Sequence, residues 1–187
     1  MTLSALGIFS AAGAGGGAAA VPAYDLLFTT TMPSDASSLT LSSLNTYAAD
    51  YKHLQIRISA KVNRTAGADD LTVRFNGDSA ANYSTHVLMG YGSMLSYGYG
   101  GGSMFIPAAA ARSTSGWSTG VVMNVLDAYS TTKNKVFRAL SGEGGGAVGL
   151  SSGSWYNTAA MTSIQFLPVY ASSILAGSRF SVYGIKG

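Results

Sequence analysis

The chain has 187 residues, of which 47% are hydrophobic and only 10% are charged. This length suits one domain with a hydrophobic core and is short for two. The formal net charge is +3, there is no cysteine, and the Lys and Arg residues are scattered singly along the chain. These features exclude a disulfide framework and a thiolate metal site, and they give no basic tract for nucleic acid.

A surface with so few ionised groups must be covered largely by Ser, Thr, Asn and Tyr. Charged side chains are costly to bury at a contact between subunits, so a low content of them favours a permanently assembled protein. We therefore expect the chain to have protein partners, copies of itself among them.

Residues 1–23 carry no charged side chain and are almost entirely Ala and Gly after Phe9. A secretory signal peptide is the alternative interpretation, but the segment lacks a positively charged start and glycines dilute its apolar part. It also holds too few strongly apolar residues for a membrane span. We interpret residues 1–23 as a docking arm and residues 24–187 as the folded domain.

Glycine loses more backbone entropy on ordering than any other residue and has no side chain with which to recover it. Such an arm gains order through contacts with another chain, for which the strongly apolar side chains are the assembly anchors: Leu3, Leu6, Ile8 and Phe9. Packing of the arm on its own domain is the alternative.

From Tyr24 onward the dominant pattern is alternation with a period of two, broken by short turn-forming clusters. In 53–61, Leu54, Ile56 and Ile58 point to one side and polar residues to the other, which predicts a half-buried strand. No segment has a convincing helical stripe, and at most a short helical turn is expected near 44–51 or 108–111. The other predicted strands are 25–30, 37–41, 71–75, 84–89, 104–107, 121–126, 135–140, 147–155, 162–167 and 179–185.

Many short antiparallel strands in one domain predict an all-β, two-sheet β-sandwich of the jelly-roll kind with an extended N-terminal arm. An up-and-down barrel is the alternative topology.

The Asn76-Gly77 pair predicts a tight turn with positive φ after the strand at 71–75, with a hairpin around it. Asp69, Asp70 and Asp78 flank this hairpin, but acidic turn residues commonly bond to the backbone, so we predict no metal and no cofactor.

Residues 89–104 read MGYGSMLSYGYGGGSM, and their spacing of tyrosines by glycines predicts a loop outside the core. Tyrosine supplies a large contact area and a hydrogen-bonding tip at low rotamer cost. Tyr91, Tyr97 and Tyr99, with Trp117, are therefore the candidate recognition residues.

Two Gly-x-Ser-x-Gly stretches, centred on Ser118 and Ser151, match the nucleophile-elbow pattern. That motif requires a strand, a strained turn and then a helix, and neither stretch precedes a predicted helix. A catalytic role for His53 or His86 is not indicated either, because each stands alone on the polar side of a strand. We predict no catalytic residues and no enzyme activity.

Several longer stretches are similar to a family of small structural proteins of tailed bacteriophages, notably phages of cyanobacteria and other aquatic bacteria. The resemblance covers nearly the whole chain, and RFNGD and SRFSVYGIKG are its most specific parts. The stretches are SALGIFSAAGAGG, TYAADYKHLQIRISAK, VRFNGDSAANYSTHVL, LDAYSTTKNKVFRALSG, WYNTAAMTSIQFLP and AGSRFSVYGIKG.

The resemblance implies a non-enzymatic virion component on the exterior of the particle, built as a homotrimer that contacts other phage structural proteins. We expect a tail-associated subunit of the fibre or baseplate, held by its N-terminal arm. A capsid decoration or cement protein is the alternative. A carbohydrate-binding module, with an aromatic platform for a host-surface glycan drawn from Trp117, Trp155 and Tyr99, is the second alternative. Neither nucleic-acid binding nor membrane insertion is expected.

Overall fold

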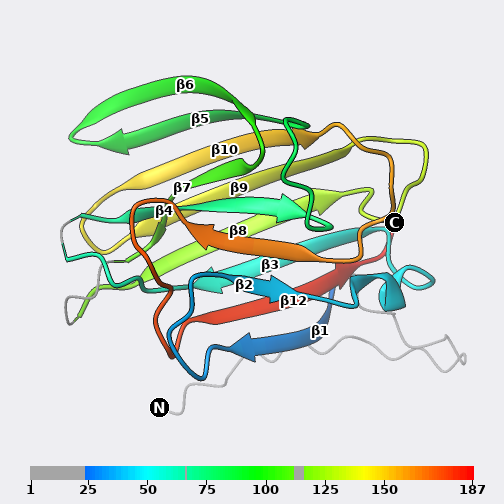
Figure 1. The fold of residues 1–187 in the computed structure, drawn as a ribbon, viewed down its shortest axis with the longest axis horizontal. Helices are drawn as coiled ribbons and strands as arrows, with labels where there is room; N and C mark the ends of the chain where they lie inside the picture. The colour runs from blue at the N-terminus through cyan, green and yellow to red at the C-terminus, as the bar shows by residue number, and fades with distance from the viewer. Residues whose placement is uncertain (1–23, 66, 112–115) are drawn as a thin grey trace, which may run out of the picture.

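The computed structural model describes residues 24–65, 67–111 and 116–187, and β-strands dominate them (Figure 1). The one helical element in these residues is a single 3-10 turn, η1 (Leu44–Tyr47). The strands are β1 (Tyr24–Thr31), β2 (Leu39–Leu41), β3 (His53–Ser59), β4 (Asp69–Phe75), β5 (Tyr83–Tyr91), β6 (Ser93–Gly101), β7 (Met104–Ala110), β8 (Thr119–Leu126), β9 (Lys135–Glu143), β10 (Val148–Trp155), β11 (Ile164–Pro168) and β12 (Arg179–Ile185).

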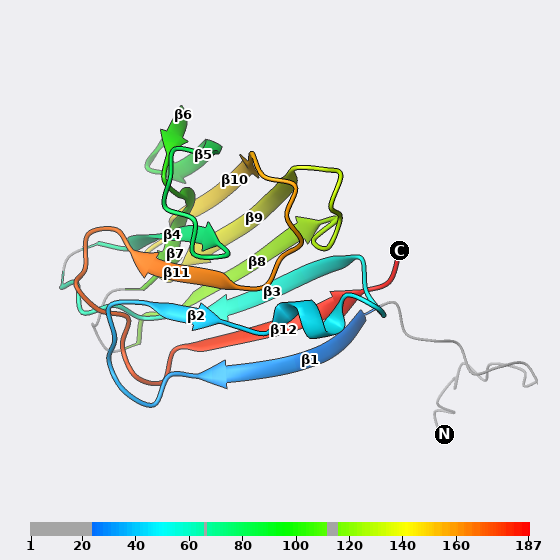
Figure 2. The ribbon, with the colours of Figure 1, turned by 45° about the vertical axis from the view of Figure 1, so that its right-hand side comes forward.

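The strands form two sheets that pack face to face, as Figure 2 shows. The eight-stranded sheet has the order β1-β12-β3-β8-β9-β10-β5-β6, and the four-stranded sheet has the order β2-β11-β4-β7. The antiparallel pairs β1·β12, β2·β11, β3·β8 and β4·β7 alternate between the two sheets. This is a long hairpin wrapped into a jelly roll, so the predicted two-sheet sandwich is confirmed and the up-and-down barrel is wrong.

Two further hairpins widen the larger sheet. β9 and β10 add next to β8, and β5 and β6 add beyond β10, so β6 and β1 are the edges of this sheet (Figure 1). The smaller sheet packs on one face of the larger sheet. We call the opposite face, which points away from the smaller sheet, the outer face.

The core lies between the two sheets and is built by the predicted alternation. Leu54, Ile56 and Ile58 of β3 are at most 3% exposed, while Arg57 between them is exposed. Phe166 of β11 packs its ring 5.1 Å from that of Phe180 of β12, which joins the two sheets. Aliphatic and aromatic side chains buried in this way supply the main free energy of folding.

The Asn76-Gly77 turn fixes one end of the core. Both residues have positive φ, 53° and 71°, as the sequence predicts. The Asp78 carboxylate then accepts hydrogen bonds from Nε1 of the buried Trp155, at 2.7 Å, and from Asn82, at 3.0 Å. The Trp155 ring stacks on the buried ring of Tyr83, with centroids 6.3 Å apart.

The prediction that this turn closes a hairpin is wrong. β4 pairs with β7 and β11 in the smaller sheet, whereas β5 pairs with β6 and β10 in the larger sheet. The turn therefore carries the chain from one sheet to the other. The Asp69 carboxylate accepts backbone N–H bonds from Tyr170 and Ala171. Among the described residues, no group of three or more His, Cys, Asp or Glu side chains is placed to hold a metal.

The prediction of a loop over residues 89–104 is also wrong. Tyr83–Tyr91 pairs residue by residue with Ser93–Gly101, and Gly92 with φ of 70° makes the turn between them. The absence of a side chain on Gly98 leaves room for the imidazole ring of His86, which lies over it. Glycine disfavours a strand locally, but pairing along the whole of β5 outweighs that preference.

The sequence allows at most a short helical turn near 44–51 or 108–111, and the structure has η1 at the first place and no helix at the second. Residues Met104–Ala110 form β7, and Ala108 has φ of 47° where the strand is irregular.

The arm, residues 1–23, with its anchors Leu3, Leu6, Ile8 and Phe9, lies outside the described residues. Where the chain is described, no helix has the length and apolarity to span a membrane.

Candidate functional site

The outer face of the larger sheet carries a row of exposed aliphatic side chains that crosses four strands. Leu88, Leu150, Leu140 and Val122 come from β5, β10, β9 and β8, and the strand register makes each the direct neighbour of the next. Their exposed fractions are 48%, 51%, 52% and 37%. A contiguous apolar row of this kind on a sheet face is a feature of contact surfaces, whereas scattered exposed apolar residues are ordinary.

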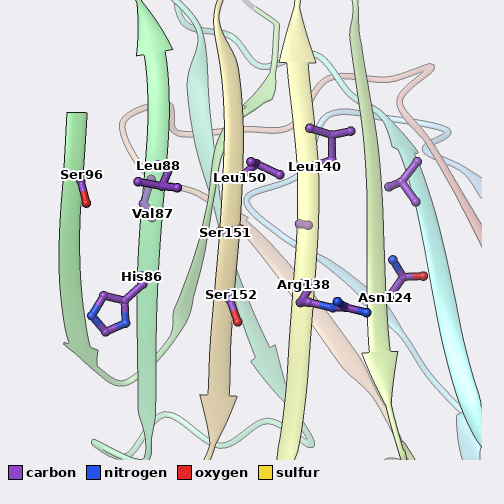
Figure 3. A pocket seen from close by; sticks show the side chains of 12 residues that line it. His86, Val87, Leu88, Ser96, Asn124, Arg138, Leu140, Leu150, Ser151 and Ser152 are labelled. Carbon is purple, nitrogen blue, oxygen red and sulfur yellow. The ribbon is translucent and has the colours of Figure 1, made fainter. Parts of the chain in front are cut away.

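A polar row lies beside the aliphatic one. His86, Ser152, Arg138 and Asn124 come from the same four strands and are again direct neighbours by register. Figure 3 shows both rows, with the Arg138 side chain extended towards Asn124. Arg138 is exposed and always charged, so it offers several N–H donors to whatever covers the aliphatic row.

Together the two rows line a shallow groove of about 760 Å³, which we call the outer-face groove. Its lining contains no carboxylate. The lining residues are His86, Val87, Leu88, Ser96, Val122, Asn124, Arg138, Ala139, Leu140, Leu150, Ser151 and Ser152. Such a surface suits an occupant that is apolar, carries no positive charge and accepts hydrogen bonds.

The absence of acidic groups extends over the whole outer face. In the eight strands of this sheet the acidic residues are Asp25 and Glu143. The Glu143 side chain is buried, and Asp25 accepts a hydrogen bond from the Tyr51 hydroxyl at 2.8 Å and lies 3.6 Å from the Lys186 ammonium. The outer face is therefore positive as well as apolar.

The sequence analysis did not identify this groove. The available signal was in the strands themselves, because 121–126 reads VVMNVL and is apolar on both sides of the alternation. Strands that are apolar on both faces are typically covered on both faces. Here Val121, Met123 and Val125 are buried by the smaller sheet, and Val122 is left facing outward.

The predicted recognition residues do not form one cluster. Tyr97 and Tyr99 lie two positions apart on β6, are 40% and 44% exposed, and face the side of the smaller sheet. The Tyr99 ring contacts Phe105 edge to face at 4.7 Å. Tyr91 ends β5 and is 60% exposed, whereas the Trp117 ring lies against Gly145 in the β9–β10 turn.

A second aromatic neighbour joins Tyr97 and Tyr99 from the small-sheet side. Burial and the nearby Asp70 carboxylate raise the pKa of the Tyr97 hydroxyl, and Tyr170 adds to that effect. Tyr170 is 66% exposed and stacks under the Arg64 guanidinium at 4.7 Å. The hairpin of β5 and β6 at the edge of the larger sheet, which we call the edge hairpin, therefore contributes to an aromatic surface that is distinct from the outer-face groove.

Neither serine of the Gly-x-Ser-x-Gly stretches occupies a nucleophile elbow. Ser151 lies in the middle of β10 with its hydroxyl buried, and this hydroxyl has no hydrogen-bond partner within the described residues. Ser118 precedes β8 directly, so no helix follows it. His53 accepts a hydrogen bond at Nδ1 from the Asp127 backbone, at 2.8 Å, which is a structural contact.

Comparison of the chain with protein-family models, with curated proteins and with solved structures finds no match.

Proposed function

We propose that this protein is a non-enzymatic structural subunit of a tailed-phage virion. In this proposal it is a tail-associated component of the fibre or baseplate on the particle exterior, it assembles as a homotrimer, and residues 1–23 anchor it to its neighbours. The jelly-roll fold supports the proposal because capsid proteins and other assembled proteins use it widely. The fold alone leaves the function open, since jelly rolls also serve lectins and cupins.

The observation that carries the proposal is the aliphatic row on the outer face. Leu88, Leu140 and Leu150 are each about half exposed and adjoin one another on a sheet face that the described residues leave uncovered. Such a row is unfavourable in a monomer, because apolar surface in contact with water raises the free energy of the monomer and promotes association. A subunit that is covered by a neighbour in a particle gains stability from the same residues.

Electron microscopy with a labelled antibody against residues 24–187 tests the location. We expect label on the tails of intact particles from the phage that encodes this protein. Label on the head instead would support the capsid decoration alternative, which uses the same arm and the same sheet face. Particles without any label would contradict a virion role of either kind.

Deletion of 2–20 from the phage gene tests the anchor. Because the described core begins at Tyr24, we expect the truncated protein to remain folded, with an unchanged thermal melting curve, and to be missing from purified particles. Normal incorporation of the truncated protein would show that residues 2–20 are not the anchor.

The exposed aromatic residues of the edge hairpin favour glycan binding as a second candidate function. Tyr97, Tyr99 and Tyr170 offer flat apolar surfaces next to the polar groups of Asp70 and Arg64, a combination that suits a sugar ring. The platform expected from the sequence does not form, because Trp155 is 1% exposed and lies in the core.

A glycan array probed with the full-length protein tests this second function. We expect any binding to be lost in Tyr97→Ala/Tyr99→Ala and kept in Tyr24→Ala, whose side chain is 49% exposed on the opposite edge strand. Equal binding by the two variants would exclude the edge hairpin as the sugar site.

A further inference from the structure

We infer that the outer-face groove is the binding site for the N-terminal segment, residues 1–23, of a neighbouring copy. Leu3, Leu6, Ile8 and Phe9 of that copy cover the aliphatic row. This inference rests on the proposed function, since it identifies the receptor of the anchoring arm.

The two surfaces are complementary in polarity. The aliphatic row offers four adjoining apolar side chains, and residues 3–9 offer four strongly apolar side chains within a short stretch. The remainder of residues 1–23 is rich in Gly and Ala, so its backbone can approach the sheet closely. Backbone carbonyls of such a segment are acceptors for the N–H groups of Arg138.

The two surfaces are also complementary in charge. Residues 1–23 contain no Lys, Arg, Asp or Glu, so covering the groove with them desolvates no second charged side chain. A second copy of the outer face would instead bring a second Arg138 and a second Arg57 into an interface that has no carboxylate. Burial of like charges without partners is strongly unfavourable, which disfavours symmetric pairing of two outer faces.

The length of the segment is sufficient. Adjacent strands lie about 4.8 Å apart, so β1 and the middle of the groove on β10 are separated by about 24 Å. About fifteen residues separate Phe9 from Tyr24 and span about 50 Å when extended. The segment is therefore long enough to place Phe9 on a groove whose centre lies within about 50 Å of Tyr24.

Within one copy the path from β1 to the groove crosses a polar ridge. Arg57 on β3 stacks its guanidinium 4.4 Å from the ring centre of Tyr183 on β12, and it also donates from Nε to Gln55 at 3.0 Å. Both strands lie between β1 and the groove. A segment from a neighbouring copy that approaches from the β5 and β6 side does not cross this ridge. Head-to-tail contacts of this kind close into a ring when the rotation between copies is that of a trimer.

Photo-crosslinking of the full-length protein tests the inference. A p-benzoylphenylalanine residue replaces Phe9, and natural-abundance chains are mixed with ¹⁵N-labelled chains before assembly and irradiation. We expect crosslinked peptides that join position 9 to β9 or β10 and that pair a light chain with a heavy chain. Crosslinks confined to a single chain, crosslinks to another surface, or a monomer without crosslinks would each overturn the inference.

Groove variants give a second readout in the same protein. Leu140→Glu/Leu150→Glu places charges under the segment and is expected to raise the dissociation constant of the oligomer at least about tenfold, as measured by analytical ultracentrifugation. Leu140→Thr/Leu150→Thr keeps strand-favouring residues and should weaken the oligomer by a smaller factor without loss of the fold. An unchanged dissociation constant in both variants would overturn the inference.

Leu95→Glu is the matched control. Leu95 is 54% exposed on β6 of the same sheet but points to the opposite face, so its replacement should leave the oligomer unchanged. The microscopy experiment separates the two proposals: a label on phage tails with crosslinks outside the groove would leave the structural role intact and reject only the groove as the binding site.

Discussion

The two faces of β8, β9 and β10 are built from the same strands, but one face is buried and the other is exposed. On the inner face, Met123, Phe137 and Ala139 are at most 4% exposed beneath the smaller sheet, whereas on the outer face Leu140 and Leu150 are about half exposed. Both faces are apolar, so hydrophobicity alone does not tell core from contact surface. The difference lies in which face a second layer covers, and that is decided by the strand order of the whole domain.

The largest expected effect in this comparison is on the inner face. Ile56→Asp places an unpaired carboxylate between the sheets, where the side chain is 0% exposed, and should lower the free energy of unfolding by about 3–5 kcal/mol. Val122→Asp, on the outer face of the neighbouring strand, should lower it by less than about 1 kcal/mol. Chemical denaturation measures both, and equal losses would mean that the two faces do not differ as described.

A buried cation gives the next largest effect. The Lys135 ammonium is buried and donates to the backbone carbonyls of Ser130, Lys133 and Thr158, at 2.6, 2.8 and 3.2 Å. Lys135→Met leaves those acceptors unpaired and should cost about 1–3 kcal/mol in urea denaturation. The control is Lys133→Met, an exposed partner of Asp127, which should cost less than about 1 kcal/mol. The reverse order would contradict a structural role for Lys135.

Acid should weaken the end of the core that Asp78 holds. Hydrogen bonds from Asn82, Trp155 and the Ala80 backbone lower the pKa of the Asp78 carboxyl. A carboxyl with a lowered folded-state pKa adds stability above its unfolded value of about 3.9, and this stability is lost as the pH falls through the folded-state pKa. The melting temperature should therefore fall less steeply between pH 6 and pH 2 for Asp78→Asn than for the wild type. Parallel profiles of melting temperature against pH would contradict this prediction.

The smallest expected effect is on the outer face. Leu150→Thr should change the free energy of unfolding of the monomeric domain by no more than about 0.5 kcal/mol, because the leucine is half exposed and threonine suits a strand. Denaturation at low protein concentration measures it. A loss above about 2 kcal/mol would show that the outer face stabilises the single domain, and the comparison between the faces would then fail.

Much of the fold could be predicted from the sequence because most strands have one polar and one buried side. The strand at 179–185 was predicted with its observed bounds, and Leu54, Ile56 and Ile58 are buried as predicted. β6 could not be predicted in the same way. Leu95, Tyr97 and Tyr99 alternate with small residues, but glycine disfavours a strand, so the sequence predicts a loop. The segment becomes a strand through pairing with β5.

The outer-face groove could not be predicted from local patterns, because its two rows cross β8, β9 and β10 and then β5, which lies far from them in the chain. Leu88 and Leu150 are neighbours through the β5·β10 pairing, which joins a hairpin inserted after β4 to one inserted after β8. Only the sheet order brings them together. Alternation indicates on which side of the strand a side chain lies. It does not indicate whether a second layer covers that side.

The pairing of Tyr24 with Ile185 places the first and last strands of the jelly roll side by side, with their outer ends at the same corner of the sheet. A tag or reporter fused after Gly187 would therefore sit where the N-terminal segment leaves the domain, and its bulk would obstruct that exit. Tags for purification or imaging are better inserted at a surface turn remote from this corner, and a bulky C-terminal fusion becomes a further test of the proposed docking of residues 1–23.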